Sequence, residues 1–192
     1  MRTQGSGGSV VGVEGEIRLY GDAALRRLAA EVTVFDAALQ ELAARLLAVR
    51  ARVRAIGVAA TQIAVERNLF AVDEGRIRRG GRAEVLVNPI VIATEGEIVA
   101  EEGCLSFPGI FINVARPQRI ALRAQDPHGR PLEREAAGML ARAYLHEIDH
   151  LQGRLFIDGV DESTRSRVQE QMRAYRQRLS AGGKSRDRGA VV

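Results

Sequence analysis

The segment His146-Glu147-Ile148-Asp149-His150 has the residue types and the spacing that suit metal-assisted hydrolysis. Histidines four residues apart lie on the same face of a helix, so both rings can reach one metal ion. Glu147 directly follows the first histidine, where it can exchange a proton with a water molecule at that ion. The chain has three histidines and two of them are in this motif. A metal site is therefore a better explanation than chance recurrence of the pattern.

A metal ion held by two histidines needs at least one more protein ligand, and the single cysteine, Cys104, is the candidate. A lone cysteine can also be a buried inert thiol or a reactive surface thiol. The preceding residues, Glu101-Glu102-Gly103, are unusual for a simple core strand. One cysteine with two histidines leaves a coordination position open for water, as in catalytic sites. The third histidine, His128, lies in a segment that predicts an exposed turn, Asp126-Pro127-His128-Gly129.

A third segment, Ile56-Gly57-Val58-Ala59-Ala60-Thr61-Gln62, ends in an amide side chain. Its small residues are equally typical of tight helix packing. The Gln62 amide, however, is a donor that can point at negative charge developing on a reacting oxygen.

Three segments together, Gly57 to Gln62, Glu102 to Ser106 and His146 to His150, resemble the motifs of peptide deformylases in that family's order and approximate spacing. Agreement of three motifs is more specific than any one of them. The resemblance runs from Ile17 to Val160 and includes Leu86-Val87-Asn88-Pro89 and Gly153-Arg154-Leu155-Phe156.

The resemblance implies a role for each matching residue. The implied metal ligands are Cys104, His146 and His150. Glu147 would be the general acid and base, and Gln62 with the backbone N–H of Leu105 would form the oxyanion hole. The metal would be one divalent ion per chain, natively Fe²⁺, with zinc, nickel or cobalt as alternatives between which the sequence does not choose.

The implied substrate is an N-formyl-methionyl peptide. It would lie extended and pair its backbone with Ile56-Gly57 on one side and with Gly103 on the other. The methionine side chain would need an apolar pocket, for which the candidates are Ile56, Leu105, Met139 and Ala143. Any of these four residues could instead be ordinary core.

A charged pair is expected to support the cysteine strand. Arg116 follows Cys104 at the spacing where the family has an arginine paired with the glutamate equivalent to Glu102. The alternative is two independently solvated charges. Asp149 either orients a ligand histidine or is an exposed helix position.

Two positions depart from the family's usual pattern. Ala55 stands where the family usually has glycine, and Leu145 stands where it usually has glutamine. The methyl group of Ala55 could narrow the substrate-pairing strand or restrict its backbone. Neither position is a ligand, the acid–base residue or an oxyanion donor, so the departures bear on efficiency and preferred substrate.

The residues around the histidine motif predict the helix that its spacing requires. Glu133 and Glu135 suit the N-terminal end of a helix, and Gly153 suits its C-terminal cap. The expected apolar face consists of Met139, Leu140, Ala143, Tyr144 and Leu151.

The remaining elements predict an α+β fold. Asp36 suits the N-cap of a first helix, whose buried stripe is expected to be Leu39, Leu42, Leu46, Val49 and Val53. Strand-like runs cover residues 69–72, 85–87, 110–114 and 120–124, and a last helix is expected over 163–179. The resemblance implies antiparallel sheets surrounding a central metal-binding helix, followed by a C-terminal helix.

The length of 192 residues predicts one catalytic domain over residues 17–162 with a basic helix over 163–180. Flexible tails are expected at 1–16 and 181–192. The N-terminus lacks the pattern of a signal peptide, and one cysteine cannot form an internal disulfide, so a cytoplasmic location is expected. We expect neither a membrane nor DNA as a partner.

Charge is concentrated at the C-terminal end. Residues 163–192 hold eight basic and two acidic residues, a net charge of +6, within a chain whose net charge is +4. This segment could contact ribosomal RNA through phosphates, or it could be a solvated helix face followed by a tail.

Three functions compete at this point. The first is a peptide deformylase, including a paralogue with a shifted substrate. The second is a zinc metallopeptidase, which commonly takes its third ligand after the two histidines, whereas no histidine follows His150. The third is a non-catalytic protein that binds ribosomes or formylated peptides, for which Glu147 and Gln62 would be unnecessary.

Overall fold

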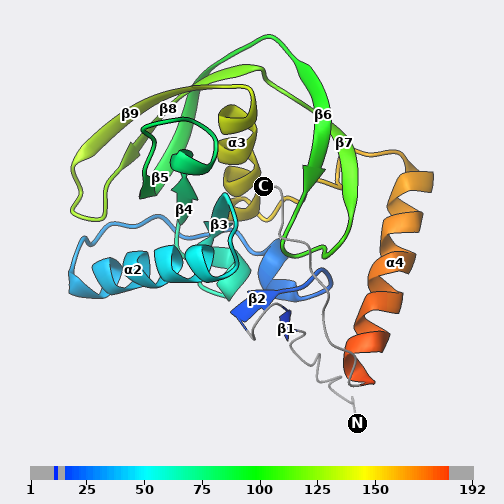
Figure 1. Cartoon of the computed structure of the whole chain (residues 1–192). Helices are drawn as coiled ribbons and strands as arrows, with labels where there is room; N and C mark the ends of the chain where they lie inside the picture. The colour runs from blue at the N-terminus through cyan, green and yellow to red at the C-terminus, as the bar shows by residue number, and fades with distance from the viewer. Residues whose placement is uncertain (1–10, 13–15, 182–192) are drawn as a thin grey trace.

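The computed structural model describes residues 11–12 and 16–181, and its centre is a helix surrounded by antiparallel strands (Figure 1). The helices are α2 (Ala37–Arg52), α3 (Met139–Leu151) and α4 (Glu162–Ser180), and the short 3-10 helices are η1 (Ala23–Arg26), η2 (Ala60–Ile63) and η3 (Glu74–Arg76). The strands are β1 (Val11–Gly12), β2 (Ile17–Arg18), β3 (Gly57–Ala59), β4 (Leu69–Asp73), β5 (Ala83–Glu95), β6 (Ile98–Gly103), β7 (Phe111–Arg116), β8 (Arg119–Gln125) and β9 (Pro131–Ala137).

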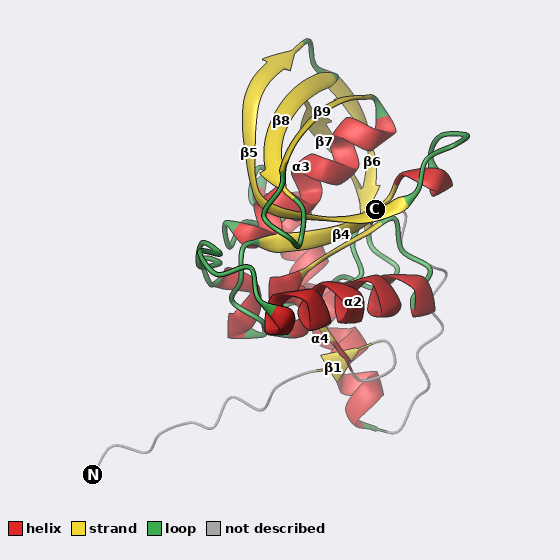
Figure 2. Ribbon diagram, turned by 90° about the vertical axis from the view of Figure 1, so that its left-hand side faces the viewer, coloured by secondary structure: helices red, strands yellow, loops and turns green. Residues whose placement is uncertain are grey.

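The strands form a five-stranded sheet and two two-stranded sheets. The larger sheet has the order β3-β4-β5-β8-β9, and the smaller ones are β6-β7 and β1-β2. All of these ladders are antiparallel. The long strand β5 curves: it pairs with β4 over residues 83–87 and with β8 over residues 87–95, and Asn88, where the partner changes, has φ of +50°. Figure 2 shows the resulting sheet wrapped around α3. The predicted α+β class is confirmed.

The first helix forms as its sequence predicts. The Asp36 side chain accepts a hydrogen bond from the Leu39 N–H and caps the free backbone donors at the start of α2. The expected apolar stripe lies against the sheet, where Leu39, Leu46, Val49 and Val53 are buried and Leu42 is partly buried. This helix covers the side of the sheet away from α3 (Figure 2).

The start of α3 differs from the sequence expectation. Glu133 and Glu135 were expected at the start of the helix, but they lie on β9, where both are exposed. Strand β9 pairs with β8 along its whole length, and Gly138, with φ of +57°, then turns the chain into the helix at Met139. Carboxylates suit a helix start, but they equally suit the solvent side of an edge strand. The helix ends where the sequence predicts, because Gly153, just after the last turn of α3, has φ of +68°.

The last helix packs on the N-terminal part of the chain. Val168 and Met172 of α4 are buried in a cluster with Leu19, Leu25 and Phe107. Two residues of the expected N-terminal tail, Val11 and Gly12, form β1 and pair with β2. Glu16, the last residue of that tail, pairs with Arg52 of α2. Residues 1–10, 13–15 and 182–192 lie outside the described residues. Of the helices that the structure describes, none is long and apolar enough to cross a membrane.

Candidate metal centre

Three side chains from two elements converge on one buried point. Cys104 directly follows β6, and His146 and His150 lie one turn apart on α3. Their ligand atoms all lie within 4.8 Å of one another, and all three residues are buried. The Cys104 Sγ atom is 3.2 Å from His150 Nε2. The structure thus brings together the three ligands expected from the sequence.

One carboxylate orients the first histidine. His146 Nδ1 lies 2.6 Å from Glu102 Oε1, and the side chain of Glu102 is fully buried. A histidine that donates from Nδ1 to a carboxylate presents its Nε2 lone pair as a ligand. His146 Nε2 is buried and has no hydrogen-bond partner among the residues that the structure describes. This unpaired nitrogen beside a thiol and a second imidazole fits a divalent metal ion.

The second histidine and the cysteine also suit a metal ion. Burial, and then the neighbouring His146, lower the pKa of His150 well below its ordinary value, so its ring is neutral. Burial raises the pKa of the Cys104 thiol above its ordinary value. The Ser106 N–H and Gln62 Nε2 lie 3.4 and 3.7 Å from Sγ, where they can donate to a thiolate. A sulfur and two imidazole nitrogens form a typical ligand set for zinc and for other divalent transition metals.

Glu147 is held at this centre by close packing. The residue is 1 % exposed, and its Oε2 atom has no hydrogen-bond partner within the described part of the chain. A Cβ atom at Gly57 would lie 2.3 Å from Glu147 Oε1, so only glycine leaves room for this carboxylate. Burial, followed by the charge of Glu102, raises the pKa of Glu147 well above its ordinary value. A carboxyl group with such a pKa can both take up and release a proton.

The amide of Gln62 has a fixed orientation. Its Oε1 atom accepts a hydrogen bond of 3.0 Å from the Ala59 N–H, so the NH₂ group must point the other way. That NH₂ group lies 3.2 Å from Ser106 Oγ and 3.7 Å from Cys104 Sγ. Leu105 is buried and directly follows Cys104. Gln62 and the Leu105 backbone therefore lie beside the ligands, as expected.

Glu102 is the centre of a buried ion network. Arg116 donates to both of its oxygens, with Nη2–Oε1 and Nε–Oε2 distances of 2.6 and 3.0 Å. Burial alone would raise the pKa of Glu102, but hydrogen bonds from His146 and Arg116 outweigh it and lower the pKa well below its ordinary range. Asp149 does not orient a ligand histidine in the structure. It accepts hydrogen bonds from Arg116 and from Arg154 instead.

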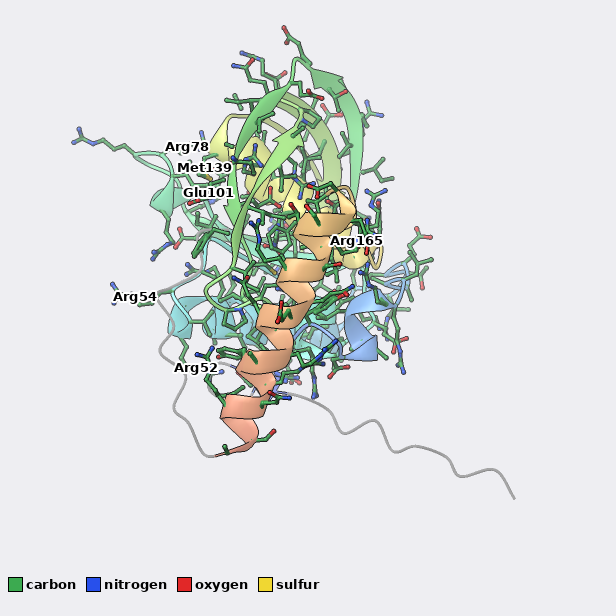
Figure 3. All side chains as sticks on the ribbon, turned by 90° about the vertical axis from the view of Figure 1, so that its right-hand side faces the viewer. Arg52, Arg54, Arg78, Glu101, Met139 and Arg165 are labelled. Atoms are coloured by element: carbon green, nitrogen blue, oxygen red, sulfur yellow. The ribbon has the colours of Figure 1, made fainter. Side chains whose placement is uncertain are left out.

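The expected substrate-binding residues do not form one cluster. Ile56 and Ala143 are buried in the same apolar cluster, whereas Leu105 belongs to the cluster beneath α2. Met139 is 38 % exposed and lies at the surface (Figure 3). Gly103 pairs with Phe111, whose ring lies 2.5 Å from where a Cβ atom at Gly103 would be. Only glycine therefore fits there, and Phe111 is a neighbour of the site that sequence reasoning missed.

Sequence reasoning also missed Arg142. Its guanidinium donates to Glu102 Oε2 and to the backbone oxygen of Ile98. The one available signal was its position four residues before His146, on the same face of the helix.

The two departures from the expected family pattern are packed away from the ligands. The methyl group of Ala55 is fully buried in the cluster beneath α2, and the Ala55 backbone is held by hydrogen bonds with Arg50. The predicted narrowing of the substrate strand by this methyl group has no support in its packing. Leu145 is partly buried against the apolar cluster around α3.

Comparison with known proteins agrees with the family resemblance of the three sequence motifs. A family model described as "Polypeptide deformylase" matches residues 15–166. A peptide deformylase of Alkalilimnicola ehrlichii is 39 % identical over 173 residues, which cover 88 % of this chain and 96 % of that protein. Among solved structures, a peptide deformylase from Legionella pneumophila aligns with a TM-score of 0.81 at 34 % identity over 88 % of this chain and 98 % of that one. The peptide deformylase of Thermus thermophilus aligns with a TM-score of 0.76 at 36 % identity over 88 % of this chain and 99 % of that one.

Proposed function

This chain belongs to the polypeptide deformylase family and removes the N-formyl group from nascent peptides, and we propose that Cys104, His146 and His150 hold its divalent metal ion. The observation that carries this assignment is the convergence of the three buried ligand atoms within 4.8 Å. The unpaired Nε2 of His146 supports it. We infer that the native ion is Fe²⁺, and that zinc, nickel or cobalt can replace it at a thiolate and two imidazoles.

The chain's own residues supply the proton transfer and the charge stabilisation. When bound, the metal ion lowers the pKa of water and polarises the formyl carbonyl group. Glu147 accepts the proton of the attacking water through its unpaired Oε2 atom. It then donates that proton to the departing amine, and formate leaves. A raised pKa suits both transfers because the group must be ionised for the first and protonated for the second.

Gln62 and the Leu105 N–H stabilise the negative charge that develops on the formyl oxygen. Because the Ala59 N–H already holds the oxygen of the Gln62 amide, its donor side needs no reorientation during the reaction. Such fixed donors contribute most when charge develops in the transition state.

The substrate is an N-formyl-methionyl peptide that pairs with the chain on two sides. Ile56-Gly57 lies at the start of β3, and Gly103 lies at the end of β6. Within the described residues each of these strands pairs with a single neighbour, so each has a second edge that an extended peptide can use. The apolar side is formed by Ile56, which is 9 % exposed and belongs to the same cluster as the fully buried Ala143, and Met139 lies at the surface.

The direct test is formate release from N-formyl-Met-Ala-Ser by protein purified without oxygen and loaded with Fe²⁺. We expect formate from the native protein and a loss of turnover of at least about 100-fold in the Glu147→Ala variant, which removes the only proton carrier proposed. Separate loading with Zn²⁺, Ni²⁺ and Co²⁺ tests the choice of metal. Metal bound at one ion per chain without formate release would contradict the assignment of the reaction.

A contact between α4 and the ribosome is a further part of the proposal. Three arginines on this helix are exposed, Arg167, Arg173 and Arg178, and the helix runs along the surface (Figure 3). Deleting the helix would be a poor test because Val168 and Met172 belong to the core. Charge reversal of the three arginines to glutamate should weaken ribosome binding in a salt-dependent way and spare turnover of short peptides.

The matched control for this test is the same charge change at Arg76, Arg79 and Arg82, which are exposed on the loop after β4. Equal ribosome binding by the two triple variants would refute the role of α4. We also infer a reducing, cytoplasmic location, since the proposed thiolate ligand is the chain's single cysteine and must stay reduced.

A further inference from the structure

Arg142 is a buried cation on the helix that carries both histidine ligands. It is 2 % exposed and lies one turn before His146 on α3. Arginine stays charged in proteins, and it is rarely this buried unless it is paired. Residues 142, 146 and 150 therefore form a single row, in which each side chain is one turn from the next.

Two acceptors on β6 hold the guanidinium group. Arg142 Nη1 donates to Glu102 Oε2 at 2.8 Å, and Nη2 donates to the Ile98 backbone oxygen at 3.0 Å. Ile98 is the first residue of β6, and Glu102 lies near its end, two residues before Cys104. A single side chain thus connects the helix of the histidines to both ends of the strand that leads to the cysteine.

Arg142 also completes the surroundings of Glu102. The carboxylate accepts from His146 and Arg116 at Oε1, and from Arg116 and Arg142 at Oε2. Each oxygen accepts two hydrogen bonds, so the carboxylate is fixed in its plane. Arg116 reaches it from β7, whereas Arg142 reaches it from the same helix as the imidazole that Glu102 orients.

We propose that Arg142 is a positioning residue for the metal ligands, and that it sets the distance between β6 and α3 and the orientation of His146 through Glu102. This inference rests on the proposed ligand set. The alternative is a role in stability alone, as for any buried ion pair. The two roles predict different effects of removing the guanidinium group. If Arg142 serves stability alone, its removal lowers stability and leaves the affinity for metal unchanged.

The chain contains a matched control for this comparison. Arg50 on α2 is 8 % exposed, and its Nη1 donates to the Asp73 carboxylate at 2.6 Å and to the Ala55 backbone oxygen at 3.2 Å. It is therefore also a buried helix arginine that binds one carboxylate and one carbonyl. The Asp73 carboxylate accepts from Arg50 and from the Gly75 N–H, whereas Glu102 contacts a metal ligand directly.

The experiment measures the affinity of the full-length protein for Co²⁺ by competition with a chelator, beside thermal unfolding of the metal-free protein. We expect Arg142→Met to weaken Co²⁺ binding by about 10- to 100-fold, the usual effect of losing a residue that supports a ligand. Arg50→Met should lower the unfolding temperature and leave the affinity within about twofold. Co²⁺ affinity that is unchanged in Arg142→Met, or reduced equally in both variants, would overturn the proposal.

A second variant covers the case in which Arg142→Met does not fold. Arg142→Lys keeps the charge but has one nitrogen instead of a planar fork, so it cannot serve both acceptors in the same way. We expect a loss of Co²⁺ affinity of at least about threefold, and native affinity would overturn the proposal. Because the readout is metal binding, it is independent of formate release. A native protein that binds Co²⁺ but releases no formate would contradict the proposed reaction and leave this test valid.

Discussion

Two buried glutamates hold α3 from two directions, and they differ in the partners that surround them. Glu102 on β6 contacts His146 and Arg142 of this helix, and Glu74 in the loop after β4 accepts a hydrogen bond from Tyr144 of the same helix. Both glutamates are buried, with exposed fractions of 0 % and 4 %. The helix is therefore fixed by one carboxylate at its ligands and by another away from them.

The arginines paired with the two carboxylates differ in their exposure to solvent. Arg116 and Arg142, which contact Glu102, have side chains that are 9 % and 3 % exposed. Glu74 is paired with Arg78, whose side chain is 59 % exposed. Water can therefore take the place of Arg78 beside Glu74, but it cannot take the place of Arg116 or Arg142 beside Glu102. We infer that the Glu102 network holds a fixed geometry for metal binding, whereas the Glu74 network attaches a surface loop to the helix.

Removing Glu102 should give the largest effect. Glu102→Ala leaves Arg116 and Arg142 as buried cations without their shared partner, which costs about 3–5 kcal/mol of unfolding free energy. It also frees the His146 ring to rotate, so metal affinity should fall by about 100-fold. Denaturant unfolding of the metal-free protein and Co²⁺ competition measure the two effects. A variant that loses stability but binds Co²⁺ normally would remove the distinction between the two glutamates.

Removing the charge of Glu74 should affect stability alone. Glu74→Gln weakens a buried hydrogen bond from Tyr144 and should cost about 1–3 kcal/mol in denaturant unfolding. Co²⁺ affinity should stay within about twofold of the native value, because Glu74 contacts Tyr144 and Arg78 and no metal ligand. If Co²⁺ binding weakened as much as in Glu102→Ala, the two networks would be equivalent.

The effect of Glu74 should depend on pH. Burial alone would raise its pKa, but hydrogen bonds from Tyr144 and Arg78 outweigh it and lower the pKa below its ordinary value of 4.5. Folding therefore favours the ionised form. Its stabilisation is complete above the pKa of the unfolded chain and is lost as the pH falls through the lower folded value. The difference in unfolding free energy between native protein and Glu74→Gln, both metal-free, should be larger at pH 7 than at pH 3. A constant difference would contradict this assignment.

Local sequence patterns predicted the helices of this arrangement. The spacing of His146 and His150 indicated the helix, and Asp36 indicated the start of α2, because both signals lie within a few residues along the chain. Glu133 and Glu135 were placed wrongly because acidic residues suit a helix start and an exposed strand face alike. Only the pairing of β9 with β8 distinguishes the two.

The contacts that Glu102 and Glu74 make with α3 were harder to predict from the sequence. Arg142 looks like an ordinary charge on an amphipathic helix, and its partner Glu102 lies 40 residues earlier in the chain. Glu74 and Tyr144 are 70 residues apart. The Glu102–Arg116 pair was expected only through the resemblance to a family. Such contacts depend on how the strands curve around α3, which no local pattern specifies.

The smallest effect is expected from Arg78, and it tests whether an exposed cation matters to a buried carboxylate. Arg78→Ala removes an i,i+4 ion pair whose arginine is 59 % exposed, and a cation that water already solvates contributes little to such a pair. Tyr144 still donates to Glu74 in this variant. The urea midpoint of unfolding should stay within error of the native midpoint, while Glu74→Gln lowers it clearly. Equal shifts in the two variants would show that the arginine, rather than the tyrosine on α3, is what holds Glu74 in place.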